Sequence, residues 1–363
     1  ATARALVRKN YVDPLWAVRT YALVSIAQHD AAWAAAGASA GAADSAAFVS
    51  AAVAASSAAT LARLYPHEVP RVAADLHAHL RALGERTRSG AALERAAALG
   101  DGIARTVFRE REDDGAVSLA SFVPPAEPGS WYSSERWPPL RPTWGEVRPF
   151  LIRETRAYAP PPPPAMGSAD FEAALATVRG HTRLASARND SIARKWADGP
   201  GTATPAGHWN EIAAGLIARH GLGEVESTRV LALMNMAMMD ASIACWRTKF
   251  EHVLLRPPQA DPTIVPTFPL PNFPSYPSGH AAFSGAASAV LAHRFPSEAG
   301  ELTRLAEEAA LSRVLSGIHY PFDSDAGLRQ GRRIADVAID LYERALPRLA
   351  SGSEPPAGGR ASP

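Results

Sequence analysis

Three groups of polar residues in the last third of the chain have the types and spacing needed to hold and transform an oxyanion. The first, Ser278-Gly279-His280, follows Pro277 and precedes a run of small, helix-compatible residues. Ser278 suits an N-cap, and a helix N-terminus offers unpaired N–H groups and the positive end of its dipole to an anion. The imidazole beside them can carry a proton. An ordinary capped helix explains this segment equally well, so the matching cations decide the interpretation.

Two basic residues precede this segment at a spacing that suits one helix face. Lys249 and Arg256 are seven residues apart, almost two helical turns, and Trp246 lies three residues before the lysine. We predict a helix over 226–255, ended by Pro257-Pro258, that projects both cations and the indole from one face. A solvated basic edge is the alternative. The apolar run beside Arg256 and the use of one of only three lysines favour an anion partner.

A third group supplies another cation and a second histidine. Arg313 precedes Gly317, which can end a helix and turn the chain, so His319 is expected in a loop closed by Pro321. Asp323 is then placed to accept a hydrogen bond from one ring nitrogen of His319 and to leave the other basic and directed. For Arg313 taken alone, binding to carbonyl groups at a helix C-terminus is the simpler explanation.

The elements that must position these groups are helices. Apolar residues recur at helical spacing, as Val18, Ala22 and Ile26 do, and little of the chain alternates as a strand does. The fold class predicted is therefore all-α. We predict helices over 13–33, 43–64, 69–86, 91–110, 168–189, 208–220, 226–255, 280–295, 299–316 and 325–346.

Composition predicts four parts along the chain. Residues 1–123 are predicted to form half of a helical bundle, and 124–167 a connecting segment rich in proline and tryptophan. Because its tryptophans stand among prolines, we expect that segment to pack along the protein as a stiff, extended strap. Residues 168–350 are predicted to form a C-terminal helical bundle with the oxyanion site. The tail, 351–363, is rich in proline, glycine and serine and is predicted to be disordered.

Composition also excludes several classes of function. The net charge of +1 gives no reason to expect nucleic acid or an anionic membrane surface as a partner. The single cysteine, Cys245, excludes an internal disulfide and a zinc site made of thiolates. We predict no membrane span, because no apolar run approaches the length needed to cross a bilayer.

Together, the three groups read Lys249-x6-Arg256-Pro257, Pro277-Ser278-Gly279-His280 and Ser312-Arg313-x5-His319-x3-Asp323. This order and spacing resemble the type-2 phosphatidic acid phosphatase and vanadium-dependent haloperoxidase superfamily. The resemblance implies an all-helical fold built on bundles, with the anion site in the C-terminal bundle.

The resemblance also implies a role for each matched residue. His319 would be the nucleophile of a phosphatase or the ligand of vanadium in a haloperoxidase, and Asp323 would orient it. His280 would be the general acid–base. The residues implied to bind the oxygens of vanadate or phosphate are Lys249, Arg256, Arg313, Ser278 and Gly279.

Flanking residues help to choose between the two chemistries. Trp246, and Phe273 seven residues before His280, resemble the arrangement in fungal vanadium chloroperoxidases and would line the halide approach. A loop rich in glycine and tryptophan is similar to bacterial haloperoxidase-like members, which implies a hydrogen bond between its Asp198 and His280. However, only 31 residues separate His280 from Ser312, a span shorter than in the fungal enzymes and close to that of soluble bacterial acid phosphatases.

The leading hypothesis is a vanadate-dependent haloperoxidase that oxidises halide with hydrogen peroxide to hypohalous acid, with Lys249 polarising the peroxide and an organic molecule as acceptor. The alternative is a soluble acid phosphatase that cleaves phosphate esters through a phosphohistidine at His319. A third hypothesis is a non-catalytic helical protein that binds an oxyanion, although binding alone would not need both His280 and Asp323. Export to the periplasm or medium is a family-level expectation, and an oligomer is compatible with the sequence.

Overall fold

The computed structural model describes residues 1–87, 89–133, 135, 137–184 and 186–350, and it confirms an all-α fold. Within those residues the only strand-like pairing is an isolated bridge between Ser130 and Leu254. The predicted tail 351–363 lies outside the described residues. The α-helices are α1 (Thr2–Lys9), α2 (Pro14–Ala38), α3 (Ser45–Leu64), α4 (Val69–Thr87), α5 (Gly90–Glu110), α6 (Ala169–Arg183), α7 (Ala187–Lys195), α8 (Thr204–Arg219), α9 (Glu224–His252), α10 (Pro257–Ala260), α11 (Gly279–Arg294), α12 (Ala299–Leu315) and α13 (Pro321–Ala350).

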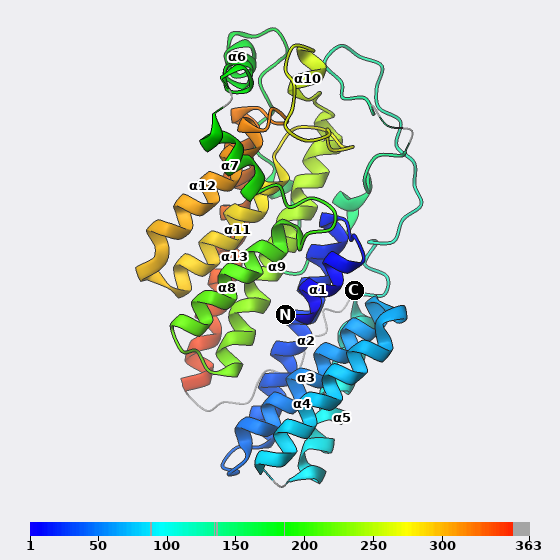
Figure 1. Ribbon diagram of the computed structural model, residues 1–363, viewed down its shortest axis with the longest axis vertical. Coiled ribbons are helices and arrows are strands. Elements are labelled where there is room, and N and C mark those ends of the chain that lie inside the picture. Colours follow the sequence, from blue (N-terminus) through cyan, green and yellow to red (C-terminus); the bar gives the residue numbers. More distant parts are fainter. Residues whose placement is uncertain (88, 134, 136, 185, 351–363) are drawn as a thin grey trace.

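Helices α2 to α5 form one end of the elongated molecule, and α7 to α9 with α11 to α13 pack beside and beyond them (Figure 1). Local chemistry starts the first long helix where the sequence predicts. The Asp13 carboxylate accepts hydrogen bonds from the backbone N–H groups of Leu15 and Trp16, and Pro14 occupies the first helical position. The predicted helix over 168–189 is instead two helices, since α6 ends at Arg183 and α7 begins at Ala187.

Helix α3 corrects the prediction about apolar length. By length and composition alone it could cross a membrane, with a mean hydropathy of 1.5. It packs against α2 and α5, and a methyl group on Gly100 of α5 would overlap the carbonyl oxygen of Ala52. Such close packing is also typical of a core helix in a water-soluble bundle, which passes the same length test.

The segment that joins the two helical regions lies along α9. Trp144 is buried and donates a hydrogen bond from its Nε1 to the Ser242 hydroxyl at 2.8 Å. The Asp240 carboxylate of α9 accepts three hydrogen bonds, from the backbone N–H groups of Phe150, Leu151 and Ile152, at 2.7 to 3.0 Å. The strap predicted from proline and tryptophan is therefore held against the helix that carries Lys249.

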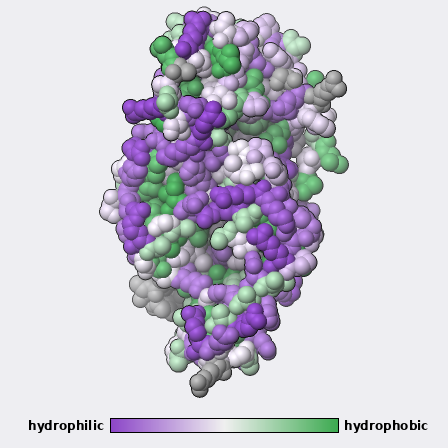
Figure 2. Space-filling view, in the orientation of Figure 1, coloured by the Kyte–Doolittle hydropathy of each residue, from purple (hydrophilic) through white to green (hydrophobic). Residues whose placement is uncertain are grey.

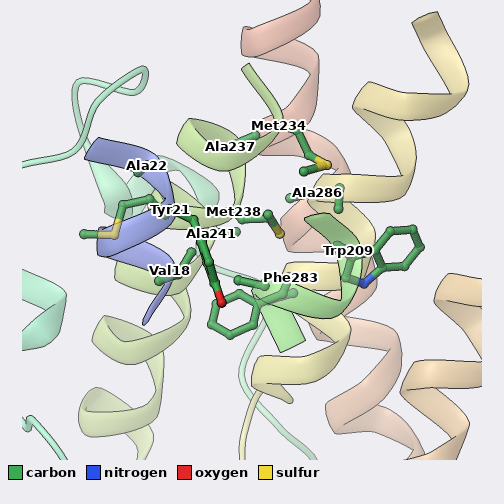
Figure 3. Packing of buried hydrophobic residues seen from close by; sticks show 14 of the residues in the cluster. Val18, Tyr21, Ala22, Trp209, Met234, Ala237, Met238, Ala241, Phe283 and Ala286 are labelled. Carbon is green, nitrogen blue, oxygen red and sulfur yellow. The ribbon is translucent and has the colours of Figure 1, made fainter. Parts of the chain in front are cut away.

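One large hydrophobic cluster runs from α1 and α2 to α13. Figure 3 shows its centre, where Val18 and Tyr21 of α2, Trp209 of α8, Met238 of α9 and Phe283 of α11 meet. The boundaries predicted at 123 and 167 stay a prediction. On the face shown in Figure 2, polar residues surround smaller hydrophobic patches.

Helices α11 and α13 approach each other closely because glycines face the neighbouring backbone. A methyl group on Gly327 would lie 2.5 Å from the carbonyl oxygen of Ser278, and one on Gly285 would lie 2.5 Å from that of Leu328. A methyl group on Gly331 would overlap the Ala282 carbonyl. The contact is completed by a hydrogen bond from the Ser278 N–H to the Asp323 carbonyl at 2.9 Å, so the N-terminal ends of both helices meet at one place.

Candidate active site

The two cations predicted on one helix face reach the site by different routes, which corrects the prediction. Helix α9 ends at His252, and Val253 adopts a left-handed conformation with φ +47° that turns the chain. Arg256 is therefore not on α9; it is the residue before α10, and Pro257 begins that short helix instead of ending a long one. Lys249 does lie on α9, in its last turn.

Lys249 and Arg256 are buried together beneath the segment before α11. The Lys249 ammonium donates to the carbonyls of Pro274 and Ser275 at 2.9 and 2.7 Å. The Arg256 guanidinium donates to the carbonyls of Phe273 and Ile318 at 3.0 and 2.7 Å. Burial lowers the pKa of Lys249 to about 7, and it also lowers the pKa of Arg256, which remains charged at neutral pH.

Arg313, on α12, is the third buried cation, with its side chain only partly used by the protein. Its Nη1 donates to the carbonyl oxygen of Trp196 at 3.1 Å. Among the described residues its Nε is a buried donor without a partner. Burial lowers the pKa of Arg313, although the negative charge of the Asp198 carboxylate acts to raise it. A buried guanidinium with an unused donor is suited to a bound anion.

The N-terminus of α11 lies beside these cations. Ser278 is the N-cap, and its hydroxyl accepts a long hydrogen bond from the Ala281 N–H at 3.5 Å. At the next position, a methyl group on Gly279 would come within 3.3 Å of the Trp246 ring. The start of the helix is thus buried, and its backbone N–H groups add a positive end of a helix dipole to the cations.

His319 and Asp323 form the hydrogen bond that their spacing predicts. Helix α12 ends at Leu315, Gly317 has φ +75°, and α13 begins at Pro321, so His319 lies in the turn between them. Its Nδ1 lies 2.8 Å from Oδ2 of Asp323. Burial, followed by the charges of Arg256 and Lys249, lowers the pKa of His319 well below its ordinary value. The ring is therefore neutral, with Nδ1–H donating to the carboxylate and Nε2 carrying the lone pair, 3.4 Å from Nη1 of Arg256.

Ser275 also holds the Asp323 carboxylate, and the sequence analysis missed it. Its hydroxyl donates to Oδ2 at 2.6 Å, and the Tyr320 N–H donates to the same atom at 3.1 Å. Burial raises the pKa of Asp323 to about 6, although these donors and the charge of Lys249 oppose the rise. The only available signal was a serine three residues before Ser278, which is too common to single out.

His280 lies in the first turn of α11, and Asp198 does not bind it as predicted. The Asp198 carboxylate lies 3.1 Å from Nδ1 of His208 instead. His280 has backbone hydrogen bonds with Trp196 and Ala197, and its Nε2 is buried without a partner in the described part of the chain. Burial, and then the charge of Arg313, lowers the pKa of His280 well below its ordinary value. A neutral His280 is thus available to accept a proton.

Trp246 and Phe273 form an aromatic wall over two of the cations. Their ring centroids are 4.8 Å apart, and the Lys249 ammonium lies 5.6 Å from the centre of the indole and 5.2 Å from the centre of the Phe273 ring. The Arg256 guanidinium lies 4.9 Å from the Phe273 centroid. The indole N–H is fixed by the carbonyl of Leu140, which belongs to the strap. The wall therefore places the polarisable aromatic rings of Trp246 and Phe273 next to positively charged side chains.

The cage comprises three cations, one serine, a helix N-terminus and two histidines, from α9, α11, α12 and the two turns between helices. In the described residues no group of three histidine, cysteine or carboxylate side chains could hold a metal cation directly. The unpartnered donor of Arg313 and the unpartnered nitrogen of His280 fit a tetrahedral oxyanion better than a bare metal ion.

Comparison with known proteins supports this interpretation. Residues 229–346 match the PAP2 superfamily, a stretch that contains every residue of the cage. The resemblance predicted from the three motifs is thereby confirmed.

Two relatives represent the two chemistries of the superfamily. The chain is 47% identical to a non-specific acid phosphatase of Salmonella typhi over 53 residues, 15% of this chain and 21% of that protein. It is 26% identical to the vanadium chloroperoxidase of Curvularia inaequalis over 174 residues, 38% of this chain and 29% of that protein. The matched regions span less than a third of either relative.

The fold is shared over nearly the whole chain with solved haloperoxidase structures. A bacterial vanadium-dependent iodoperoxidase superposes with a TM-score of 0.79 at 21% identity, over 93% of this chain and 94% of that one. A bacterial vanadium-dependent chloroperoxidase in its holo form gives a TM-score of 0.75 at 15% identity, over 92% and 93% of the two chains. The fold is therefore like that of vanadium haloperoxidases, including the N-terminal bundle.

Proposed function

We propose that this protein is a vanadate-dependent haloperoxidase that oxidises halide with hydrogen peroxide. The observation that carries the proposal is the aromatic wall of Trp246 and Phe273, which lies directly over Lys249 and Arg256. A halide ion is large and polarisable, and it favours positive charge screened by aromatic surface over a pocket of hydroxyl groups. The fold shared with bacterial haloperoxidases along nearly the whole chain supports the same function.

The residues present fit vanadate. Lys249, Arg256 and Arg313 would neutralise its oxygens, Ser278 and the Gly279 N–H would donate to them, and Nε2 of His319 would bind the vanadium. When bound, vanadate supplies a Lewis acid that activates hydrogen peroxide toward attack by halide.

The protein's own groups prepare that chemistry. Asp323 fixes the tautomer of His319 and keeps its Nε2 basic. The carbonyls of Pro274 and Ser275 hold the Lys249 ammonium in place, so it can donate toward an oxygen that gains negative charge. His280 accepts a proton at Nε2, and the burial of the cage excludes water that would compete with the substrates.

A soluble acid phosphatase is the second candidate, favoured by the 47% identity to the Salmonella typhi enzyme. The same atoms would serve it: Nε2 of His319 would attack phosphorus, and His280, after taking up a proton at Nε2, would pass it to the departing oxygen. Each donor fixed toward the developing charge contributes roughly 3 kcal/mol to either transition state.

One purified sample assayed in two ways distinguishes these functions. Peroxide-dependent halogenation of a phenolic dye that appears only when vanadate is added supports the haloperoxidase. If vanadate only inhibits hydrolysis of an aryl phosphate, the haloperoxidase proposal fails and the phosphatase stands. If the sample binds vanadate with neither activity, both enzyme proposals fail and a non-catalytic oxyanion-binding protein remains.

Matched variants connect the halogenating activity to the aromatic wall. Phe273→Ala, which opens the wall, is expected to raise the KM for halide by about tenfold while leaving vanadate affinity within about threefold, because it removes a cation–π contact of roughly 1 to 2 kcal/mol. Phe122→Ala is the control, since the Phe122 ring forms an aromatic pair with Phe250, with centroids 4.8 Å apart, and belongs to neither the aromatic wall nor the cage. Equal effects of the two variants on the KM for halide would contradict the assignment.

A further inference from the structure

A hollow that lies outside the cage is lined by arginines of the strap and of α9. It has a volume of about 330 Å³, which suits a small molecule, and none of its lining residues belongs to the cage. Its four positive and two negative side chains leave an excess of two positive charges. These side chains are Arg148, Arg153, Arg156, Arg247, Glu146 and Glu154.

Buried contacts hold the strap against α9 beside this hollow. The Asp240 carboxylate binds the backbone of residues 150–152, which lie between two of the arginines in the sequence. The Arg247 side chain donates from Nε to the Gly145 carbonyl at 3.1 Å, and a methyl group on Gly145 would lie 2.5 Å from Cα of Arg247. The walls of the hollow are therefore fixed by the packing of the fold.

Three of the arginines use only part of their hydrogen-bonding capacity within the protein. Arg156 and Arg247 share one carboxylate, that of Glu251, at 3.5 and 3.7 Å. Arg148 donates to the backbone carbonyl of Glu110, a group without a formal charge. Because each guanidinium has five N–H donors, most of these donors stay available to a ligand.

The fourth arginine, Arg153, is exposed, and within the described part of the chain its guanidinium forms no hydrogen bond or ion pair. Glu146 and Glu154 are exposed as well, and neither forms an ion pair with a described residue. The two glutamates therefore do not neutralise the arginines directly. Like charges gathered in one hollow repel each other, and a bound anion reduces that repulsion.

We propose that this hollow is a second anion site, which binds a small organic molecule carrying at least two negative charges on carboxylate or phosphate groups. A planar guanidinium donates two parallel hydrogen bonds to either group. Two negative charges match the excess of positive charge in the hollow, and the bound molecule would contact the strap and α9 together. The proposal does not rest on the proposed function, because the hollow and the cage share no residue.

Calorimetric titration without vanadate tests the site with two probes. Succinate presents two carboxylates, and methylenebisphosphonate presents two phosphonates, as substitutes for phosphate, on a P–C–P link that a phosphatase does not hydrolyse. Saturable binding of at least one probe is expected, and the tighter probe identifies the preferred group. Acetate, with a single charge, is expected to bind at least about tenfold more weakly than that probe. If neither probe binds, or if acetate binds as tightly as the better probe, the proposal fails.

Variants locate the binding in the hollow. Arg153→Gln removes one charge without breaking a contact to a described residue, and it is expected to weaken binding of the preferred probe by about tenfold. Arg71→Gln is the matched control, because Arg71 is likewise exposed, lies on α4 and does not line the hollow. It removes the same charge and is expected to bind the probe as the wild type does.

A third variant, Arg313→Met, distinguishes the hollow from the cage. It changes the cage alone, so the binding that depends on Arg153 is expected to remain. Equal effects of Arg153→Gln and Arg71→Gln would mean that the probe responds only to overall charge, and loss of binding in Arg313→Met would mean that it binds in the cage. Either result would overturn the proposal. Because vanadate, peroxide and esters are absent, the outcome is independent of which activity the protein has.

Discussion

Arg313 offers the sharpest perturbation, because the structure predicts opposite effects on stability and on anion binding. Its guanidinium is buried, donates to one carbonyl, and has an Nε without a partner among the described residues. Arg313→Met replaces this charge with an apolar side chain of similar length. Removing a poorly paired buried charge contributes about 1 to 3 kcal/mol of stability, and the loss of the hydrogen bond to Trp196 offsets roughly 1 kcal/mol of it.

The effect on the bound oxyanion is larger and has the opposite sign. Two hydrogen bonds from a guanidinium to an anion contribute about 3 to 5 kcal/mol, so Arg313→Met is expected to weaken vanadate or phosphate binding by roughly a hundredfold or more. Without ligand, the free energy of unfolding should be unchanged or higher by about 2 kcal/mol. With ligand at about a hundred times the wild-type dissociation constant, only the wild type should gain stability, by about 2.7 kcal/mol.

The assay is urea unfolding with and without phosphate, together with calorimetric titration of vanadate. Arg19→Met is the matched control, because Arg19 is equally buried but pairs with the Asp114 carboxylate at 3.0 Å. That variant leaves a buried carboxylate unpaired, so it should lose about 3 to 5 kcal/mol of stability and little anion affinity per folded molecule. If Arg313→Met behaves like Arg19→Met, the inference that Arg313 is kept for the anion is refuted.

Two further predictions follow from the cage and from the helices that carry it. Burial lowers the pKa of Lys249 to about 7, and a bound anion favours the charged ammonium, so vanadate binding should take up a proton and weaken as the pH rises above 7. Calorimetry in buffers of different ionisation enthalpy measures the number of protons taken up. The same number of protons in Lys249→Met as in the wild type would contradict the prediction. The valine side chain in Gly331→Val would overlap the Ala282 carbonyl and push α11 away from α13, so the free energy of unfolding should fall by about 3 kcal/mol. Gly300→Ala adds a methyl group with no atom near it and should raise the free energy of unfolding by about 0.5 to 1 kcal/mol. Equal effects of the two variants in urea unfolding would contradict the packing argument.

Local chemistry made part of the site predictable from the sequence. Gly317 and Pro321 lie on either side of His319 in the sequence. Asp323, four residues after His319, lies within hydrogen-bond distance of it because His319 is in a tight turn and Asp323 is in the first turn of the helix that follows. The same holds for Ser278 as the N-cap of α11. In each case the residues that set the geometry are adjacent in the chain, so their spacing alone carries the information.

Contacts between distant segments were less predictable. Val253 takes a left-handed conformation that its β-branched side chain disfavours, so nothing in the local sequence indicated that α9 would end before Arg256. Asp198 binds His208 rather than His280 because a left-handed turn re-aims the loop, and Ser275 reaches Asp323 across 48 residues. The three motifs still predicted the cage because Lys249 and Arg256 both bind carbonyl groups of residues 273–275, although Arg256 lies outside α9.

The most direct test of the cage is a calorimetric titration of vanadate into the wild type and into His319→Ala, with His77→Ala as control because His77 is exposed on α4. If Nε2 of His319 anchors the vanadium, His319→Ala should lose tight binding while His77→Ala binds as the wild type does. Full vanadate affinity in His319→Ala would contradict the account.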